Sequence, residues 1–470
     1  MNIKFNRLFA ILFLSLCMLC ANNIKSYGQH TIEFSASDGH TLTWWDVYNG
    51  IVNYMAANDL DDYPIFNAVI DAEEIGVGVF NPGSPTGNVI SAKGSDVKKI
   101  SKNAFTYTGL TEIDFPAVTE IGETAFSCTQ LERVEFPACT KIEKNAFAEC
   151  KKLYHAEFPA LWTSLGVSAF NGCTNLYSVY IPRLLFVVYN RAFSGCASLT
   201  TNDELAPLGS GFTIKAVLIE PNAFSGCKSI KGLDLSHTVT IKEFAFSGCS
   251  GIKEMSLPLA DFIGEEAFGD CSAIQKLNLP RVETIESFAF VNNTSLTEAA
   301  LPSIKTVGNR AFWGCKKLKK VTFGSGHTEA QMIILGQQIF GGIGKGAPTG
   351  AEDIELELGE NVLPAPNGNS WNGYTWKKIT IVPAVPVGIV ETGHALSLLR
   401  VYPNPANNIV SVECEQRATI IFYDILGKEV LSQNIDGKAE INVSHLPKGN
   451  YIVNAVSEGK VMGSSKIVKQ

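Results

Sequence analysis

Apolar and polar positions repeat along the middle of the chain at a nearly constant spacing. The dipeptide Ala-Phe recurs ten times, at intervals of 21 to 31 residues, and an apolar residue always stands five positions before its Phe. The recurring Phe residues are Phe105, Phe126, Phe147, Phe170, Phe193, Phe224, Phe246, Phe268, Phe290 and Phe312. Self-similarity of this kind is typical of a protein built from stacked structural repeats.

Each repeat predicts one short β-strand that ends near a proline. In residues 274–280, which read Ile-Gln-Lys-Leu-Asn-Leu-Pro, the last apolar pair alternates with a period of two, as along one face of a strand. Pro280 lacks the N–H group that further pairing would need. We expect the remainder of each repeat to return irregularly or as a short helix, with its Phe and Ile inside. One repeat buries too little apolar surface to fold alone, so stability must come from stacking.

The repeats resemble the BspA-like, or Treponema-type, leucine-rich repeat, whose units read C-x-x-L-x-x-I-x-L-P followed by I-x-x-x-A-F. The match is close over residues 97–323, and weaker copies lie at 75–80 and 335–340. The resemblance implies a leucine-rich-repeat solenoid with short parallel strands. We expect an N-terminal cap region at 29–69, repeats at 70–350, an inserted loop at 200–211 and a C-terminal cap at 351–382.

A column of cysteines follows the recurring Phe at a distance of three residues. Its members are Cys150, Cys173, Cys196, Cys227, Cys249, Cys271 and Cys315, and Asn293 takes this place in one repeat. Side chains in register on neighbouring rungs point the same way and rarely meet the geometry of a disulfide. No local pair of ligands has zinc-like spacing. We therefore expect buried free thiols rather than disulfides or a metal site.

The last 75 residues have a different pattern, in which alternating segments are separated by Gly, Asn and Pro turns. After a predicted linker at 383–395, residues 396–470 predict a small immunoglobulin-like β-sandwich. They resemble the type A C-terminal sorting domain of the type IX secretion system. The residues that carry this resemblance are Tyr402, Pro403, Asn404, Pro405, Gly427, Lys428, Gly449, Lys466 and Lys469. The resemblance implies handling by the type IX machinery and surface attachment or release; an ordinary binding sandwich is the alternative.

Residues 1–28 predict a secretory signal peptide. Lys4 and Arg7 precede an apolar run at 8–19, which is shorter than the roughly 20 residues that span a bilayer as a helix. A retained anchor and a lipoprotein are the alternatives. No later run is long enough to cross a membrane, so we expect an exported chain, secreted or at the outer-membrane surface, with no transmembrane span after cleavage.

Composition and motifs argue against catalysis and against binding to nucleic acid. The formal net charge of -8 and a pI near 5.5 would repel phosphate backbones. The seven His residues are scattered, with no HExxH motif, and the chain has no G-x-S-x-G elbow. We predict no enzyme, no cofactor and no metal.

The remaining candidate for function is the concave face of the solenoid, where residues between the buried strand positions point outwards. Its candidate ligand-binding residues are Glu112, Asp114, Glu132, Arg133, Glu135, Tyr154, His155, Glu157, Tyr177, Tyr180, Lys231, Lys253, Lys276 and Lys320. Early rungs are acidic and then aromatic, and late rungs carry lysine. The hypothesis is an adhesin-like protein that binds host or microbial surface macromolecules, protein or glycan. The alternative is a structural or carbohydrate-contacting scaffold without one defined protein ligand.

Overall fold

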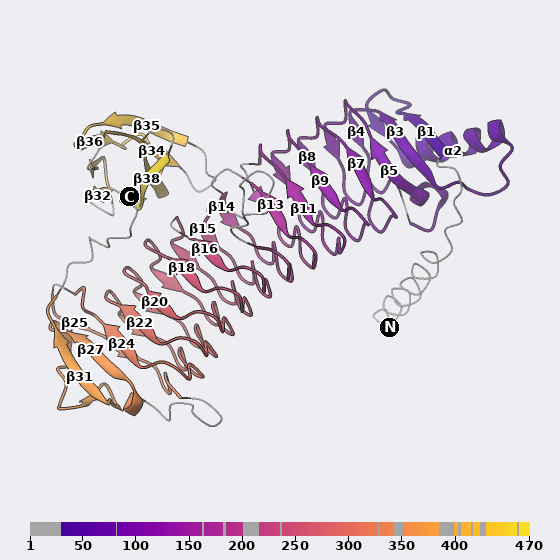
Figure 1. The fold of residues 1–470 in the computed structure, drawn as a ribbon. Coiled ribbons are helices and arrows are strands. Elements are labelled where there is room, and N and C mark those ends of the chain that lie inside the picture. Colours follow the sequence, from indigo (N-terminus) through magenta and orange to yellow (C-terminus); the bar gives the residue numbers. More distant parts are fainter. Residues whose placement is uncertain are drawn as a thin grey trace, which may run out of the picture.

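Two structural units, each with its own hydrophobic core, make up the described part of the computed structural model. A repeat array covers residues 30–384, and a C-terminal domain covers residues 399–470 (Figure 1). The structure describes residues 30–470 except 81, 162–163, 182–184, 201–215, 236, 328, 342–350, 385–398, 403–405, 415–416, 424–428 and 458–459. The predicted signal peptide, most of the predicted linker and nearly all of the insertion expected at 200–211 lie outside these residues. Among the described residues, no helix has the length and apolar character of a membrane span.

The first ladder of the array is a parallel sheet of 13 very short strands. Its strands, in order, are β2 (Thr41–Leu42), β4 (Glu74–Ile75), β6 (Lys99–Ile100), β8 (Glu120–Ile121), β10 (Lys141–Ile142), β12 (Ser164–Leu165), β14 (Leu185–Val188), β15 (Ala216–Ile219), β17 (Thr240–Ile241), β19 (Phe262–Ile263), β21 (Thr284–Ile285), β23 (Thr306–Val307) and β26 (Ile334–Leu335). The apolar residue five positions before each repeat Phe lies in this ladder. Its side chain is buried, as at Ile100, Ile142 and Ile263.

The second ladder contains the strands that the repeats predict before each proline, and its described strands form four parallel sheets. The sheets are β1 (His30–Ser35), β3 (Phe66–Asp71), β5 (Val89–Lys93) and β7 (Glu112–Asp114); β9 (Arg133–Glu135), β11 (His155–Glu157) and β13 (Ser178–Tyr180); β16 (Gly232–Asp234) and β18 (Glu254–Ser256); and β20 (Lys276–Asn278), β22 (Glu298–Leu301), β24 (Lys320–Phe323), β27 (Glu355–Gly359) and β31 (Lys378–Val382). We call the solvent-facing side of these strands the strand face.

The expectation of one strand per repeat is wrong, because the return segment contains a second strand. Most of these extra strands consist of one polar residue followed by one buried apolar residue, as in Lys141-Ile142. Two residues are too few for an alternation to show in a sequence. Stacking makes the ladder instead: β10 pairs in register with β8 on one side and with β12 on the other.

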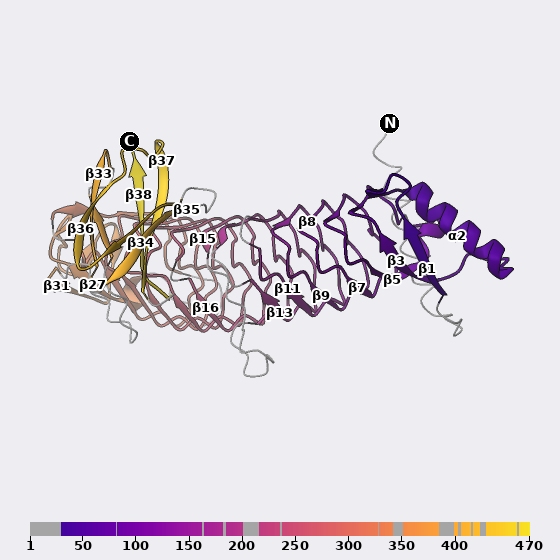
Figure 2. The same cartoon turned by 90° about the horizontal axis from the view of Figure 1, so that it is seen from above.

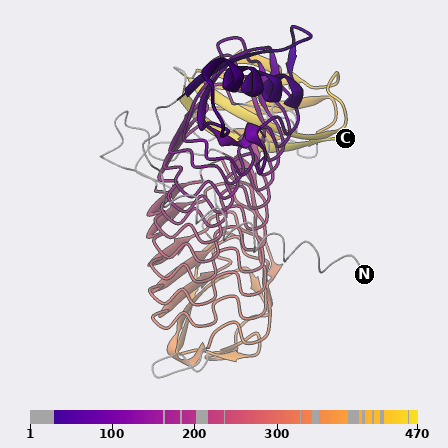
Figure 3. The ribbon, with the colours of Figure 1, turned by 90° about the vertical axis from the view of Figure 1, so that its right-hand side faces the viewer.

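Stacked phenylalanine rings fill the interior of the array. From Phe80 to Phe340, consecutive repeat rings lie 4.6–6.0 Å apart between centroids, with interplanar angles of 2–15°. Phe147, Phe246 and Phe312 are fully buried in one continuous core. Figure 3 shows the array as a pile of flattened coils. The prediction that the recurring Phe and Ile residues fill a stacked rod is confirmed.

The cysteine column joins neighbouring rungs through hydrogen bonds. The Cys173 thiol donates to the carbonyl oxygen of Phe147 at 3.0 Å, and the Cys249 thiol donates to that of Phe224 at 3.0 Å. The same bond recurs at Cys150, Cys196, Cys227, Cys271 and Cys315. These thiols are buried and free, as predicted. Burial raises the pKa of Cys315 to about 12, which keeps it a thiol that can donate.

The turn around each Ala-Phe pair contains two residues with left-handed backbone. Around Phe147 these are Asn145 (φ 55°) and Glu149 (φ 60°), and around Phe246 they are Phe244 (φ 57°) and Gly248 (φ 74°). Residues other than Gly pay a steric cost in this conformation. The turn is therefore held by the packing of the rungs rather than by local preference alone.

The N-terminal end of the core is covered by helix α2 (Trp44–Asn58), which Figure 2 shows at one end of the array. Its first turn has a capping box: the Thr43 hydroxyl accepts from the Asp46 N–H, and the Asp46 carboxylate accepts from the Thr43 N–H. The helix buries Val47 and Ile51. The short helix η1 (Pro85–Asn88) follows between β4 and β5.

The other end of the core is closed by aromatic residues of a short hairpin. The hairpin strands are β29 (Ser370–Trp371) and β30 (Tyr374–Thr375), and the remaining elements here are η2 (Ala351–Asp353), β25 (Gln331–Met332) and β28 (Val362–Leu363). Trp371 and Trp376 are buried, and both rings contact Phe323. The last rungs therefore do not end in an open apolar face.

The C-terminal domain consists of two antiparallel sheets around a separate core, as predicted for a small β-sandwich. One sheet contains β32 (Arg400–Tyr402), β33 (Ile409–Glu413) and β36 (Lys438–Asn442); the other contains β35 (Glu429–Ile435), β34 (Ala418–Tyr423), β37 (Gly449–Ser457) and β38 (Lys460–Lys469). Val412, Phe422 and Val453 are buried between them.

Candidate binding face of the repeat array

The middle of the strand face brings together eight of the residues predicted to bind a ligand. Strands β9, β11 and β13 pair in register, which aligns their side chains in columns across the rungs. The column at the first strand position consists of Arg133, His155 and Ser178. The column at the third position consists of Glu135, Glu157 and Tyr180. The column just before the strands consists of Glu132, Tyr154 and Tyr177, which are joined by backbone hydrogen bonds.

Three tyrosines lie on two adjacent rungs of this region. The Tyr154 side chain is among the exposed large hydrophobic groups, with 47% of its surface accessible. Tyr177 and Tyr180 are half-buried on the next rung. Such partly exposed aromatic side chains offer large contact areas and a hydroxyl group to a partner.

Charged groups surround His155 on this part of the face. Arg133 forms an ion pair with Glu135 on its own strand. The Nε2 atom of His155 lies 3.7 Å from a carboxylate oxygen of Glu157. Burial, with a further effect from Arg133, lowers the pKa of His155 below its ordinary value despite the two glutamates. Both effects disfavour the protonated form of the imidazole.

The predicted acidic residues Glu112 and Asp114 lie on a different sheet. Both are exposed on β7, which is the last strand of the N-terminal sheet and does not pair with β9. The structure therefore places them on the same side of the array as the tyrosines but outside the three-strand ladder.

The predicted lysines lie further along the array, where Lys276 and Lys320 form ion pairs across the rungs. Lys276 pairs with Glu298 at 2.9 Å, and Lys320 pairs with Glu357 at 2.7 Å. The hydrogen bond to Glu357 raises the pKa of Lys320. Lys231 and Lys253 are exposed and lie on neighbouring rungs, where the Lys253 N–H donates to the Lys231 carbonyl.

Sequence reasoning missed the two glutamates of these ion pairs. Glu298 belongs to a repeat whose strand reads Glu-Ala-Ala-Leu, and Glu357 lies in the segment predicted as the cap. Counting one strand position from repeat to repeat would have found Glu298, since it lies 22 residues after Lys276. From β20 to β31, one column of the strand face therefore alternates between Lys and Glu.

Four of the predicted sorting residues lie in described strands of the C-terminal domain. Tyr402 ends β32, Gly449 begins β37, and Lys466 and Lys469 lie in β38. The chain just after the Tyr-Pro-Asn-Pro motif meets the C-terminus, because Ala406 forms a β-bridge with Lys469 and accepts from the Gln470 N–H. Pro403, Asn404, Pro405, Gly427 and Lys428 lie outside the described residues.

Family models give the decisive comparison. The model of the BspA type leucine-rich repeat region matches six copies over residues 73–200 and 217–340, which together cover more than half of the chain. The chain belongs to the BspA type leucine-rich repeat family. The model of the secretion system C-terminal sorting domain matches residues 400–470. No curated protein matches significantly.

Solved structures with a likeness to this BspA-type chain are other bacterial proteins. A leucine-rich repeat protein from Bacteroides ovatus is 24% identical, with 54% of this chain and 82% of that one covered and a TM-score of 0.30. A leucine-rich cell surface protein from Faecalibacterium prausnitzii is 18% identical, with 64% and 96% covered and a TM-score of 0.33. The pneumococcal vaccine antigen PcpA is 18% identical, with 73% and 89% covered and a TM-score of 0.34.

The two family matches define the class and the export route of the protein. It is a bacterial leucine-rich-repeat surface protein of BspA type with a sorting domain for secretion. The sorting domain directs handling by the type IX machinery, to the cell surface or the outside. Both families are typically non-enzymatic.

Proposed function

We propose that this protein is an adhesin-like binding protein that recognises a host or microbial surface macromolecule through the strand face at β9, β11 and β13. The observation that carries the proposal is the exposed Tyr154 ring, with Tyr177 and Tyr180 on the next rung and charged residues around them. Aromatic residues ringed by polar groups are typical centres of protein–protein interfaces. The recurring apolar side chains are buried in the core of the array. A ligand must therefore contact the exposed side chains between them.

The proposal also includes a non-enzymatic role. The residues gathered on this face are aromatic and charged contact groups on rigid strands, which suits recognition. Charge patterning along the face would orient a partner, with the Arg133–Glu135 and His155–Glu157 region beside the tyrosines and the Lys–Glu pairs further along.

The test is saturable binding of the purified, labelled protein to intact host epithelial cells and to co-resident bacteria. The triple variant Tyr154→Ala, Tyr177→Ala and Tyr180→Ala should lose at least about tenfold in affinity, because central aromatic anchors carry most of an interface's energy. Tyr107→Ala is the matched control, since this ring is 61% exposed in the turn after Phe105. Equal binding by the triple variant and the wild type would contradict the assignment of the face. Absence of saturable binding to any surface would favour a structural scaffold instead.

A further inference from the structure

Three potential metal ligands converge on β9 and β11. Glu135 and Glu157 are register partners on the two strands, and His155 lies two residues before Glu157 on the same side of β11. One ligand atom from each residue, a ring nitrogen of His155 and a carboxylate oxygen of each glutamate, lies within 4.8 Å of the other two. Among the described residues, this is the one group of three or more His, Cys, Asp or Glu side chains whose ligand atoms lie this close together.

The imidazole nitrogen in this cluster has an unmet bonding capacity. His155 Nε2 is buried and has no hydrogen-bond partner among the described residues, and its distance of 3.7 Å from the Glu157 carboxylate is too long for a hydrogen bond. A buried polar atom without a partner costs free energy, so native structures rarely leave one without a reason. A metal ion between His155 and the glutamates would supply the missing partner.

The donor set identifies the kind of ion. One imidazole nitrogen and two carboxylates suit Zn²⁺, which binds nitrogen and oxygen ligands at about 2.0–2.2 Å in a four-coordinate site. Calcium takes six to eight oxygen ligands and has little use for an imidazole. The two strands are already in register. Rotamer changes of the three side chains are therefore enough to bring the ligand atoms to metal-binding distance.

Arg133 is the competing cation in this arrangement. Its guanidinium pairs with Glu135, one of the three ligands, and it lies directly across from His155 in the strand register. The Arg133 side chain is 48% exposed and can swing into solvent when another cation takes its place. Arg133 should therefore weaken zinc binding rather than assist it.

We propose that Glu135, His155 and Glu157 form a zinc-binding site on the strand face, with Arg133 as an internal competitor for Glu135. Three protein ligands leave a fourth position for water or for a group from outside the chain. Glu135 is 51% exposed at the side chain and Glu157 is 25% exposed, so this position is open to solvent. The inference stands independently of the proposed adhesive role.

The experiment is a zinc chloride titration of the full mature chain, stripped of metal with a chelator and measured by competition with a chromophoric zinc chelator. The wild type should bind one equivalent of zinc. His155→Ala and Glu157→Gln should each bind this equivalent at least about tenfold more weakly. Arg133→Gln should tighten the same equivalent severalfold. His40→Ala is the control, because His40 lies 3.7 Å from a Glu73 carboxylate but at an exposed site that Lys98 already neutralises.

A spectroscopic readout separates a metal site from a structural role. Cobalt chloride should give visible d–d bands of a four-coordinate nitrogen and oxygen site in the wild type, and His155→Ala should abolish them while its circular dichroism stays unchanged. Unchanged zinc affinity in His155→Ala, or tighter binding of calcium chloride than of zinc chloride at this site, would overturn the proposal. Weaker binding in Arg133→Gln would overturn the role assigned to Arg133.

Discussion

At the scale of single residues, Asn293 shows what the cysteine column does. It occupies the position of a column cysteine, and its Nδ2 donates to the Phe268 carbonyl at 2.8 Å, as the thiols do to their own Phe carbonyls. Its Oδ1 is buried and has no hydrogen-bond partner among the described residues. Each position of the column therefore requires a small side chain that donates a hydrogen bond to the neighbouring rung. A thiol does this without the additional carbonyl oxygen that an amide brings.

This requirement predicts the outcome of two substitutions at the same site. Asn293→Ala removes the donor and should lower the free energy of unfolding by about 1–3 kcal/mol, because the Phe268 carbonyl loses its partner in a dry interior. Asn293→Cys keeps a donor and removes the orphaned oxygen, so its stability should equal or exceed that of the wild type. Urea denaturation followed by circular dichroism measures both; a cysteine variant less stable than the alanine variant would disprove the role.

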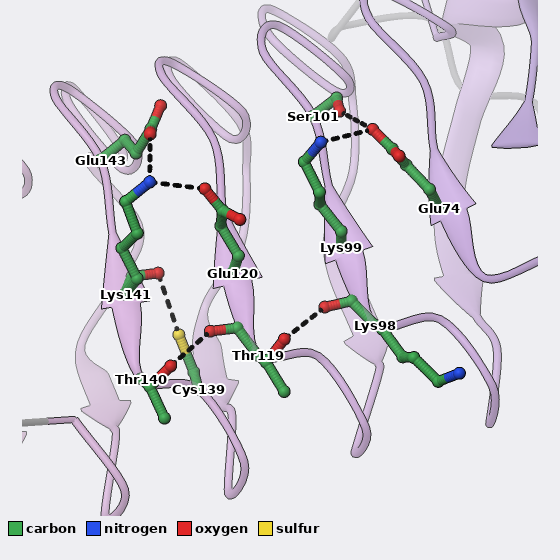
Figure 4. A network of polar contacts seen from close by, with 10 residues as sticks. All are labelled: Glu74, Lys98, Lys99, Ser101, Thr119, Glu120, Cys139, Thr140, Lys141 and Glu143. Atoms are coloured by element: carbon green, nitrogen blue, oxygen red, sulfur yellow. Dashed lines mark hydrogen bonds and ion pairs between the residues drawn. The ribbon is translucent and has the colours of Figure 1, made fainter.

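Ion pairs across the first ladder give the array a pH dependence. Figure 4 shows Glu74 accepting from Ser101 and Lys99, and Lys141 between Glu120 and Glu143. Burial alone would raise the pKa of Glu74, but its bonds to Ser101 and Lys99 bring it below the usual 4.5. The folded state then binds fewer protons than the unfolded chain, so the stabilisation from Glu74 is present above pH 4.5 and is lost as the pH falls through the folded-state pKa.

Glu74→Gln should therefore lower stability at pH 7 by less than about 1 kcal/mol, because the pair is partly exposed and solvent screens it. The gap between variant and wild type should narrow as the pH falls below 4.5. Urea midpoints at a series of pH values check both points. Glu329→Gln, which removes an exposed carboxylate outside this network, controls for net charge. A gap that widens on acidification would contradict the sign.

At the scale of the repeat, the stacked ring is the unit of stability. Phe246 lies between Phe224 and Phe268, with ring centroids 5.1 and 5.2 Å away, and strand β17 of its repeat pairs with β15 and β19 of the adjacent repeats. In a quasi-one-dimensional array, each unit is stabilised by its nearest neighbours. A destabilising substitution in one rung should therefore unfold the adjacent rungs before the whole array unfolds.

Phe246→Ala should cost about 3–5 kcal/mol, the range for truncating a buried aromatic side chain. Hydrogen exchange should rise first in the amides of the flanking rungs, between about residues 219 and 290, while the capped end at α2 stays protected. Tyr154→Ala is the control, since an exposed side chain should change stability by less than about 0.5 kcal/mol. Uniform loss of protection along the array would show that the rungs do not act as separate units.

At the scale of the whole molecule, the sequence predicted the parts that its period repeats. The Phe and Ile columns, the cysteine column and the C-terminal β domain could all be read from spacing or motif. The two-residue strands could not, because a pair such as Lys141-Ile142 has no periodicity of its own. The cluster of Glu135, His155 and Glu157 also escaped, since the distance between atoms on adjacent rungs depends on register and rotamer. Predicting the ion pairs Lys276–Glu298 and Lys320–Glu357 likewise requires the strand register between adjacent rungs.

The family match assigns export to the C-terminal domain, so truncation should separate export from the folding of the repeat array. Deletion of residues 396–470 removes a domain with its own core and leaves the core of the array intact. The truncated chain should accumulate in the periplasm, as cell fractionation and immunoblotting would show. The complementary fusion of a signal peptide, a folded reporter and residues 385–470 should reach the cell surface. Surface display of the truncated chain would contradict a sorting role for this domain.

The continuous first ladder has a consequence for how such proteins change length. Every rung presents the same backbone edge to the next, so a gene duplication or deletion of one whole repeat leaves all remaining pairs in phase. Each added rung extends the rod by about 4.8 Å. The length of the rod is therefore a quantity that recombination can adjust stepwise, without redesign of either capped end.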